Sequence, residues 1–172
     1  MDVETLSTAF EVAFAFAEAP KGWPVLAGAH GSGKTHLAAA IANMCIEGGR
    51  PVFFVGVSDL LDHLRASYAP TSDIGYSDLF QQVKEAPLLV LDGLGGQSAT
   101  PWAEEKLYQL LVHRHNARLP TVITVDSGVE LKPALSSRLK DMRFVVPIEI
   151  EVPDYRDQTA RPPARSRRAP SR

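Results

Sequence analysis

One short glycine-rich stretch constrains this chain more than any other feature of its sequence. The stretch consists of Gly28, Ala29, His30, Gly31, Ser32, Gly33, Lys34 and Thr35. It matches the pattern G-x-x-x-x-G-K-[ST], in which glycines let the backbone curl so that successive N–H groups point at phosphate oxygens. The helix that follows presents its positive amino-terminal end to the same anion. The sequence therefore predicts a nucleotide-binding loop in which Lys34 reaches the β- and γ-phosphates and the Thr35 hydroxyl binds Mg²⁺.

Apolar, strand-like runs alternate with segments of helical periodicity along the chain. The predicted strands lie near 24–28, 52–57, 87–92, 121–126 and 144–150. A predicted helix over residues 5–19 precedes the first strand, and the glycine-rich loop lies between that strand and a long helix. Strands that alternate with helices favour a parallel sheet with helices on both faces, so the predicted fold class is α/β.

An acidic residue follows the third predicted strand. Residues 88–91 are all apolar, and Asp92 comes directly after them. A nucleotide site of this kind needs a carboxylate at the end of another strand to hold Mg²⁺, directly or through water. We therefore expect Thr35 and Asp92 to bind the metal, and we count Lys34 and Asp92 among the catalytic residues.

Cysteine content and the first residues of the chain indicate its compartment. Cys45 is the only cysteine, which excludes a disulfide scaffold and any four-cysteine zinc or iron–sulfur site. Asp2 and Glu4 stand where a secretion signal carries Lys or Arg. No apolar run reaches the roughly 18 residues that a membrane helix requires. We expect a cytoplasmic protein without a membrane partner.

The net charge of −2 hides an asymmetry between the body of the chain and its end. Residues 1–155 hold 12 Lys and Arg against 19 Asp and Glu, whereas residues 156–172 hold six Arg against one Asp. An acidic body does not suit a broad DNA-binding surface, because affinity for phosphates requires clustered cations. The end is rich in Arg and Pro and lacks apolar periodicity, which predicts a disordered tail that could touch nucleic acid or an acidic partner. The predicted domain is therefore residues 1–155.

Five sequence segments together carry a family resemblance. They read GSGKTHLAAAIAN, LLVLDGLG, LPTVITVD, SSRLKD and PDYR, in that order. From about Thr5 to Arg156 the chain resembles the DnaC/DnaI helicase-loader and IstB transposition-helper branch of the AAA+ ATPases. The resemblance implies a P-loop NTPase of AAA+ type, with a five-stranded parallel sheet in the order 5-1-4-3-2 and flanking helices. It also implies ATP and Mg²⁺ as cofactors, and an oligomer that delivers a replicative helicase or a transposase to DNA.

The same resemblance assigns roles to particular residues. Residues 33–35 match the Walker A loop and Asp92 matches the first Walker B acid. Arg138 matches the arginine finger, which would reach the γ-phosphate bound by a neighbouring subunit. Arg156 matches the sensor-2 arginine that binds nucleotide. Two alternatives stay open: Arg138 as a solvated helix arginine, and Arg156 as a charge of the tail.

Two positions depart from the family pattern. The family ends Walker B with two acids, the second of which orients the attacking water, and Gly93 stands at that second position. The sensor-1 position, which contacts the nucleotide and is normally Asn, holds Asp126, whose carboxylate cannot donate a hydrogen bond to the γ-phosphate. We expect ATP binding to survive while hydrolysis is slow or lost, unless Glu104, Glu105 or Asp126 compensates.

Several function classes agree with these residues. The first is an ATP-binding AAA+ protein of the helicase-loader type. Such a protein would bind ATP and would assemble with a helicase or with copies of itself. Single-stranded DNA is a further candidate ligand. The alternatives are a non-catalytic module whose assembly depends on ATP, and a transposition-helper ATPase. A kinase built on the same loop would need a lid that carries Arg and an acceptor site, and no clear segment supplies either.

Partner recognition is the least constrained property. The predicted core begins almost at Met1, so either the chain is a minimal or truncated member of the group or partner recognition lies on the core itself. Helix 5–19 carries Phe10, Phe14 and Phe16, which suit either core packing or an interaction face. Core packing is our first expectation for them.

Overall fold

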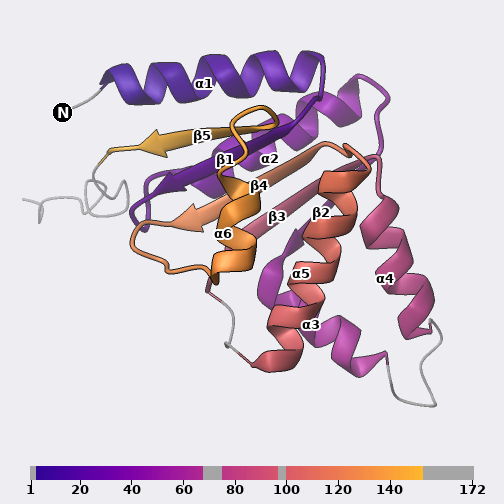
Figure 1. Cartoon of the computed structure of the whole chain (residues 1–172). Coiled ribbons are helices and arrows are strands. Elements are labelled where there is room, and N and C mark those ends of the chain that lie inside the picture. The colour runs from indigo at the N-terminus through magenta and orange to yellow at the C-terminus, as the bar shows by residue number, and fades with distance from the viewer. Residues whose placement is uncertain (1–2, 68–74, 97–99, 153–172) are drawn as a thin grey trace, which may run out of the picture.

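Five parallel strands form a single sheet with helices on both of its faces (Figure 1). The computed structural model describes residues 3–67, 75–96 and 100–152. The strands are β1 (Trp23–Gly28), β2 (Val52–Gly56), β3 (Leu88–Leu94), β4 (Thr121–Asp126) and β5 (Val145–Ile150). The helices are α1 (Val3–Glu18), α2 (Lys34–Glu47), α3 (Val57–Ala66), α4 (Tyr76–Glu85), α5 (Pro101–Asn116) and α6 (Pro133–Leu139). The strand order is β2-β3-β4-β1-β5, which confirms the predicted order 5-1-4-3-2 counted from the other edge.

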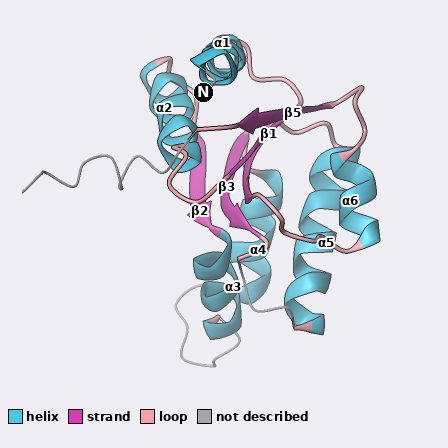
Figure 2. Cartoon of the chain, turned by 90° about the vertical axis from the view of Figure 1, so that its left-hand side faces the viewer, coloured by secondary structure: helices cyan, strands magenta, loops and turns pink. Residues whose placement is uncertain are grey.

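Successive residues of the central strands point to opposite faces of the sheet and build two separate cores. In β3, Leu89 and Leu91 join the cluster that includes α3, α4 and α5, whereas Leu88 and Val90 join the cluster with α1 and α2. Figure 2 shows these two groups of helices on opposite sides of the sheet. A strand covered on both faces needs apolar residues at every position, which is why residues 88–91 predict a central strand correctly.

Several element boundaries differ by one or two residues from the sequence prediction, and two of them, the carboxyl ends of β3 and β2, lie on the glycine-rich loop's side of the sheet. β3 continues past Asp92 to Leu94, and its pairing with β4 shifts in register between Leu91 and Leu94. Gly93, between them, has a φ of +80°. In β2, the strand that pairs with β3 on the side opposite β4, the carboxyl end is Gly56, one residue earlier than predicted, because α3 begins at Val57.

α1 has a buried face and an exposed face. Its buried residues are Ala9, Ala13, Phe16 and Ala17, which pack in the same core as α2. Phe10 and Phe14 stack on each other with ring centroids 6.4 Å apart, and they stay 62% and 46% exposed. The expectation of core packing is therefore right for Phe16 and wrong for Phe10 and Phe14. No helix of the described residues, α1 included, is long and apolar enough to cross a membrane.

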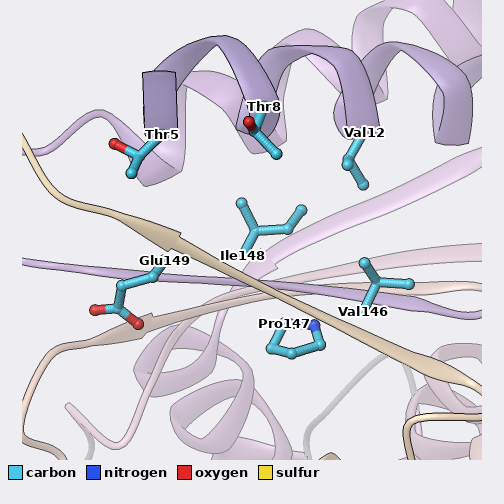
Figure 3. Close-up of a pocket in the computed structure, with 7 residues that line it drawn as sticks. All are labelled: Thr5, Thr8, Val12, Val146, Pro147, Ile148 and Glu149. Atoms are coloured by element: carbon cyan, nitrogen blue, oxygen red, sulfur yellow. The ribbon is translucent and has the colours of Figure 1, made fainter. Parts of the chain in front are cut away.

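A hollow of about 420 Å³ lies between α1 and the edge strand β5 (Figure 3). Its lining consists of Thr5, Thr8 and Val12 from α1 and Val146, Pro147, Ile148 and Glu149 from β5. Figure 3 shows the Ile148 side chain pointing from the strand toward α1. Pro147 has no backbone N–H, and a proline in an edge strand weakens that edge as a template for a further strand.

One charged side chain lies fully inside the core. Arg114 of α5 donates from Nη1 to three carbonyl oxygens at the carboxyl end of α4, the shortest bond being 2.8 Å to Ala86. Its remaining nitrogens donate to Thr121 Oγ1 at 2.9 Å and to the Pro120 carbonyl oxygen at 2.6 Å. Burial lowers the pKa of Arg114 to about 10, so the guanidinium stays charged at neutral pH. The hydrogen bonds of the Arg114 side chain therefore connect α5 to the carboxyl end of α4 and to the start of β4.

Candidate nucleotide-binding site

The glycine-rich loop joins the carboxyl end of β1 to the amino end of α2. Gly31 and Gly33 have φ values of 76° and 94°, in the left-handed region that favours glycine. Gly28 has no room for a side chain, because a Cβ there would lie 2.7 Å from both the Ile150 carbonyl oxygen and Ser32 Oγ. The glycines of the pattern therefore stand where the backbone conformation or the packing requires them.

Lys34, the first residue of α2, makes three polar contacts within the chain through its ammonium group, two hydrogen bonds and one ion pair. Its Nζ donates to the carbonyl oxygens of Gly28 at 3.0 Å and Ala29 at 2.7 Å, and it lies 2.9 Å from Asp126 Oδ1. The Lys34 side chain is 8% exposed and that of Asp126 is 47% exposed, so the carboxylate lies on the solvent side of the ion pair. Asp126 ends β4 beside Gly28 of β1, which brings the predicted sensor-1 residue to the loop.

Asp92 lies between two threonines. Thr35 Oγ1 lies 2.9 Å and 3.1 Å from the two carboxylate oxygens of Asp92. Thr124, which is buried in β4, donates to Asp92 Oδ1 at 2.7 Å and accepts a hydrogen bond from the Gly93 backbone N–H at 2.8 Å. The two predicted metal-binding side chains, Thr35 and Asp92, are therefore in direct contact.

Sequence reasoning missed Thr124. The signal for it was a second threonine in the strand of residues 121–125, placed two positions before Asp126. Side chains two positions apart in a strand share one face, so Thr124 and Asp126 act together at the carboxyl edge of the sheet. Thr124 contacts Asp92, and Asp126 contacts Lys34.

The environment of Ser32 indicates whether the loop suits an anion. Its Oγ is buried and has no hydrogen-bond partner among the described residues. A buried hydroxyl without a partner costs free energy, and a phosphate oxygen would satisfy it. Thr35 and Asp92 add oxygen donors of the kind that Mg²⁺ prefers. The residues present therefore fit a phosphate group with Mg²⁺.

The position predicted to orient water offers no side chain. A Cβ added at Gly93 would meet no atom within 4 Å, so the space for an acidic side chain is present. The carboxylates expected to compensate each have another partner in the structure: Asp126 pairs with Lys34, and Glu104 pairs with Lys132. Glu105 accepts a hydrogen bond from Gln109 of its own helix at 2.8 Å.

Arg138 lies on α6, away from the glycine-rich loop. Its guanidinium carbon lies 5.0 Å from the centroid of the Tyr108 ring on α5, within the range of a cation–π contact. It lines a polar hollow of about 460 Å³ together with His115, Asn116, Ser137, Asp141 and Arg143. Stacking on Tyr108 gives the side chain a defined direction at the surface of the molecule.

Asp141 connects this polar hollow to the amino ends of β1 and β5. Its carboxylate accepts a hydrogen bond from Arg143 Nε at 3.0 Å and lies 3.2 Å from His115 Nε2. The hydrogen bond from Arg143 is the main reason that the pKa of Asp141 lies below its usual value. The His115 ring packs edge-on against Trp23, the first residue of β1. Because the glycine-rich loop follows the opposite end of β1, the structure does not bring Arg138 together with Lys34 within one chain.

The remaining predicted site residues either are exposed or lie outside the described residues. Ala29 and His30 are exposed on the loop. Arg156 and the predicted tail of residues 156–172 lie outside the described residues, so their assignments stay predictions.

Comparisons with known families and sequences agree on one group. The family model of the IstB-like ATP binding protein matches residues 12–135. The replicative helicase loader DnaC of Escherichia coli strain K12 is 27% identical over 118 residues, which are 68% of this chain and 48% of the relative. The uncharacterized protein YdaV of the same strain is 36% identical over 118 residues, 66% of this chain and 46% of the relative. The chain spans about half the length of these curated relatives.

Solved structures show the same fold. A crystal structure of the DnaC helicase loader superposes with a TM-score of 0.72 at 23% identity, over 87% of this chain and 92% of that one. The AMPPCP-bound DnaA of Aquifex aeolicus superposes with a TM-score of 0.73 at 20% identity, over 89% of this chain and 49% of that one. At these identities the superpositions show a common fold.

Proposed function

Because the chain belongs to the IstB-like ATP binding protein family, we propose that it binds ATP at residues 28–35. The single observation that carries the proposal is the contact between Thr35 and Asp92, at 2.9 Å, next to a lysine held inside the loop. Lys34 and Thr35 begin α2, directly after the loop that follows β1, and Asp92 lies in β3; the sheet order brings them to one edge. We extend the proposed ATP-binding core over residues 1–155.

The same site is proposed to take Mg²⁺ with the nucleotide. Thr35 and Asp92 would hold the ion, and a bound Mg²⁺ would neutralise part of the phosphate charge. Ser32 would donate its hydroxyl to a phosphate oxygen, and Lys34 would turn its ammonium group from the chain to the phosphates.

Hydrolysis in this protein is proposed to be slow. Attack on the γ-phosphate requires a group that orients the water molecule. Gly93 has no side chain for this task, and the carboxylates of Glu104, Glu105 and Asp126 have the other partners described above. The proposed main activity is therefore nucleotide binding, with ATP hydrolysis as a slow secondary activity.

Arg138 is proposed to complete the site of a neighbouring copy. It lies at a surface hollow, directed by Tyr108, and it is not brought to Lys34 of its own chain. An arginine in this position would stabilise charge on a nucleotide bound by the next subunit, as arginine fingers do. The proposed working form is thus an oligomer that assembles with ATP.

The partner is proposed from the relatives. One of them is named a replicative helicase loader, so a replicative helicase is the first proposed partner. A transposase, which the sequence resemblance implies, is the second. One similar structure is a replication initiator bound to AMPPCP and single-stranded DNA, which makes single-stranded DNA the nucleic acid to test. We propose that nucleotide binding controls assembly on such a partner in the cytoplasm.

One set of measurements tests these proposals. ATP affinity, ATP turnover and mass in solution are measured with and without single-stranded DNA, with Lys34→Ala as the variant that should lose binding. Turnover stimulated by DNA supports a loader-type ATPase. Tight binding and ATP-dependent oligomers without turnover support the second candidate, a non-catalytic assembly module, which Gly93 favours. Equal ATP affinity of the wild type and Lys34→Ala would contradict the proposed site.

A further inference from the structure

We propose that Asp126 sets the nucleotide preference of this site by disfavouring a triphosphate relative to a diphosphate. The inference rests on the proposed nucleotide-binding function and assigns a role that neither Lys34 nor Asp92 supplies. It starts from the ion pair between Asp126 Oδ1 and Lys34 Nζ, which are 2.9 Å apart.

Asp126 is held in place by the sheet. It ends β4 in register with Gly28, the last residue of β1, and the next backbone N–H, that of Ser127, donates to the Gly28 carbonyl oxygen at 2.9 Å. The carboxylate is therefore attached to the rim of the loop by regular strand pairing. It is also half-exposed, so it borders the space from which a nucleotide approaches Lys34.

A phosphate that binds Lys34 meets the contacts that the ammonium group already makes. Lys34 Nζ donates to the carbonyl oxygens of Gly28 and Ala29, and it also lies 2.9 Å from the Asp126 carboxylate. A phosphate oxygen that accepts a hydrogen bond from Nζ lies within about 6 Å of Asp126 Oδ1 while the ion pair persists, since each contact measures about 2.9 Å. The nucleotide therefore either approaches a like charge or displaces it from Lys34.

The charges linked by these contacts favour the smaller anion. Lys34 supplies one positive charge, while Asp92 and Asp126 supply two negative charges. Asp92 is directed at Thr35 and Thr124, which leaves Asp126 as the carboxylate beside the lysine. A triphosphate carries an additional negative group near this lysine, and like charges at such distances repel. Asp126 thus disfavours ATP more than ADP.

A different role for the same carboxylate makes the opposite prediction. If Asp126 held a metal ion, its removal would weaken binding of the nucleotide with Mg²⁺ and leave binding without Mg²⁺ unchanged. In the structure Asp126 faces Lys34, whereas Thr35 contacts Asp92. The geometry favours the electrostatic role.

The test compares the full chain with Asp126→Asn, which keeps the shape of the side chain and removes its charge. Calorimetry measures the Kd of ADP and of AMPPCP, an ATP analogue, with and without Mg²⁺. We expect the wild type to bind ADP more tightly. We expect Asp126→Asn to tighten AMPPCP binding by about tenfold and ADP binding by less than about threefold.

Ser127→Ala is the matched control, because the Ser127 side chain contacts Glu149 at 3.2 Å and not Lys34. It should leave both Kd values unchanged, and thermal unfolding should show that both variants fold. A ratio of AMPPCP to ADP affinity that stays the same in Asp126→Asn overturns the inference while the proposed function stands. Weaker AMPPCP binding only in the presence of Mg²⁺ overturns it in favour of the metal role. A wild type that binds neither nucleotide overturns the proposed function, and the inference with it.

Discussion

Thr124 of β4 donates a hydrogen bond to Asp92 of β3, with 2.7 Å between Thr124 Oγ1 and Asp92 Oδ1. The same hydroxyl accepts from the Gly93 N–H at 2.8 Å, at the point where β3 loses its regular pairing with β4. One buried side chain therefore orients the Asp92 carboxylate and also accepts a hydrogen bond from the backbone N–H of Gly93, beside the irregularity in the strand pairing.

Thr124→Val should separate the contribution of the two hydroxyl hydrogen bonds from the contribution of side-chain packing. Valine has nearly the shape of threonine but lacks the hydroxyl. The variant removes both hydrogen bonds of the Thr124 hydroxyl, the one to Asp92 and the one from the Gly93 N–H, so we expect the free energy of unfolding to fall by about 1–3 kcal/mol. We also expect nucleotide affinity in the presence of Mg²⁺ to fall by roughly tenfold, since a lost hydrogen bond of this kind is worth about 1.5 kcal/mol. Urea unfolding and calorimetry measure the two effects.

Thr124→Ser is the control, because serine keeps the hydroxyl. It should recover most of the Mg²⁺-dependent affinity even if the lost methyl group lowers stability. If Thr124→Val bound nucleotide with Mg²⁺ as tightly as the wild type, Thr124 would have no positioning role.

Arg114→Met should be among the most destabilising single changes in the described core. The substitution leaves carbonyl oxygens of α4, including that of Ala86, without their donor in a buried place. We expect the free energy of unfolding to fall by about 3 kcal/mol or more, as for the loss of other buried charged hydrogen-bond networks. Chemical denaturation measures the change.

Arg65→Met is the matched control for that substitution. Arg65 is exposed and contacts the Trp102 ring at 5.0 Å, so its removal should cost at most about 1 kcal/mol. Equal losses for the two variants would show that the buried network of Arg114 contributes little.

The sequence predicts most of this fold because its strongest signals are local. The glycine pattern, the fully apolar run of residues 88–91 and the alternation of strands and helices each follow from short stretches of chain, and the family resemblance supplies the strand order. Arg114 and Thr124 were not predicted as structural residues. Their partners lie far away in sequence, so no local pattern shows that a carbonyl of α4 or the Asp92 carboxylate will meet them.

The same limit applies to side-chain exposure and charge pairing. Phe10, Phe14 and Phe16 belong to one helical run, and the positions of α2 and of the neighbouring strands decide that Phe16 is buried and the other two are exposed. Asp126 was predicted to offer no hydrogen-bond donor to the γ-phosphate. Its pairing with Lys34 depends on the register of β4 against β1, which short-range patterns do not contain.

Stability in acid should depend on Asp141. The hydrogen bond from Arg143, supported by the charge of Arg143 and the contact with His115, holds the pKa of Asp141 below its usual 3.8 in the folded protein. A carboxyl group with a lowered pKa stabilises the fold above its unfolded-state pKa, and this contribution is lost as pH falls through the folded-state pKa. The wild type should therefore lose stability below about pH 4 more steeply than Asp141→Asn. Urea midpoints between pH 6 and pH 2 measure the two slopes, and parallel slopes would contradict the assignment.

Gly93 provides the sharpest test of the proposed slow hydrolysis, because the structure supplies space for a side chain there but an unfavourable backbone angle. With φ at +80°, any residue other than glycine should cost about 1 kcal/mol of stability. Gly93→Glu adds the missing carboxylate at that cost, whereas Gly93→Ala has the same cost without a carboxylate. We expect Gly93→Glu to raise ATP turnover at least about tenfold above Gly93→Ala, within the usual contribution of a positioned acid or base. Similar turnover of both variants, with both still folded and binding ATP, would mean that the absence of an acid at this position does not limit hydrolysis.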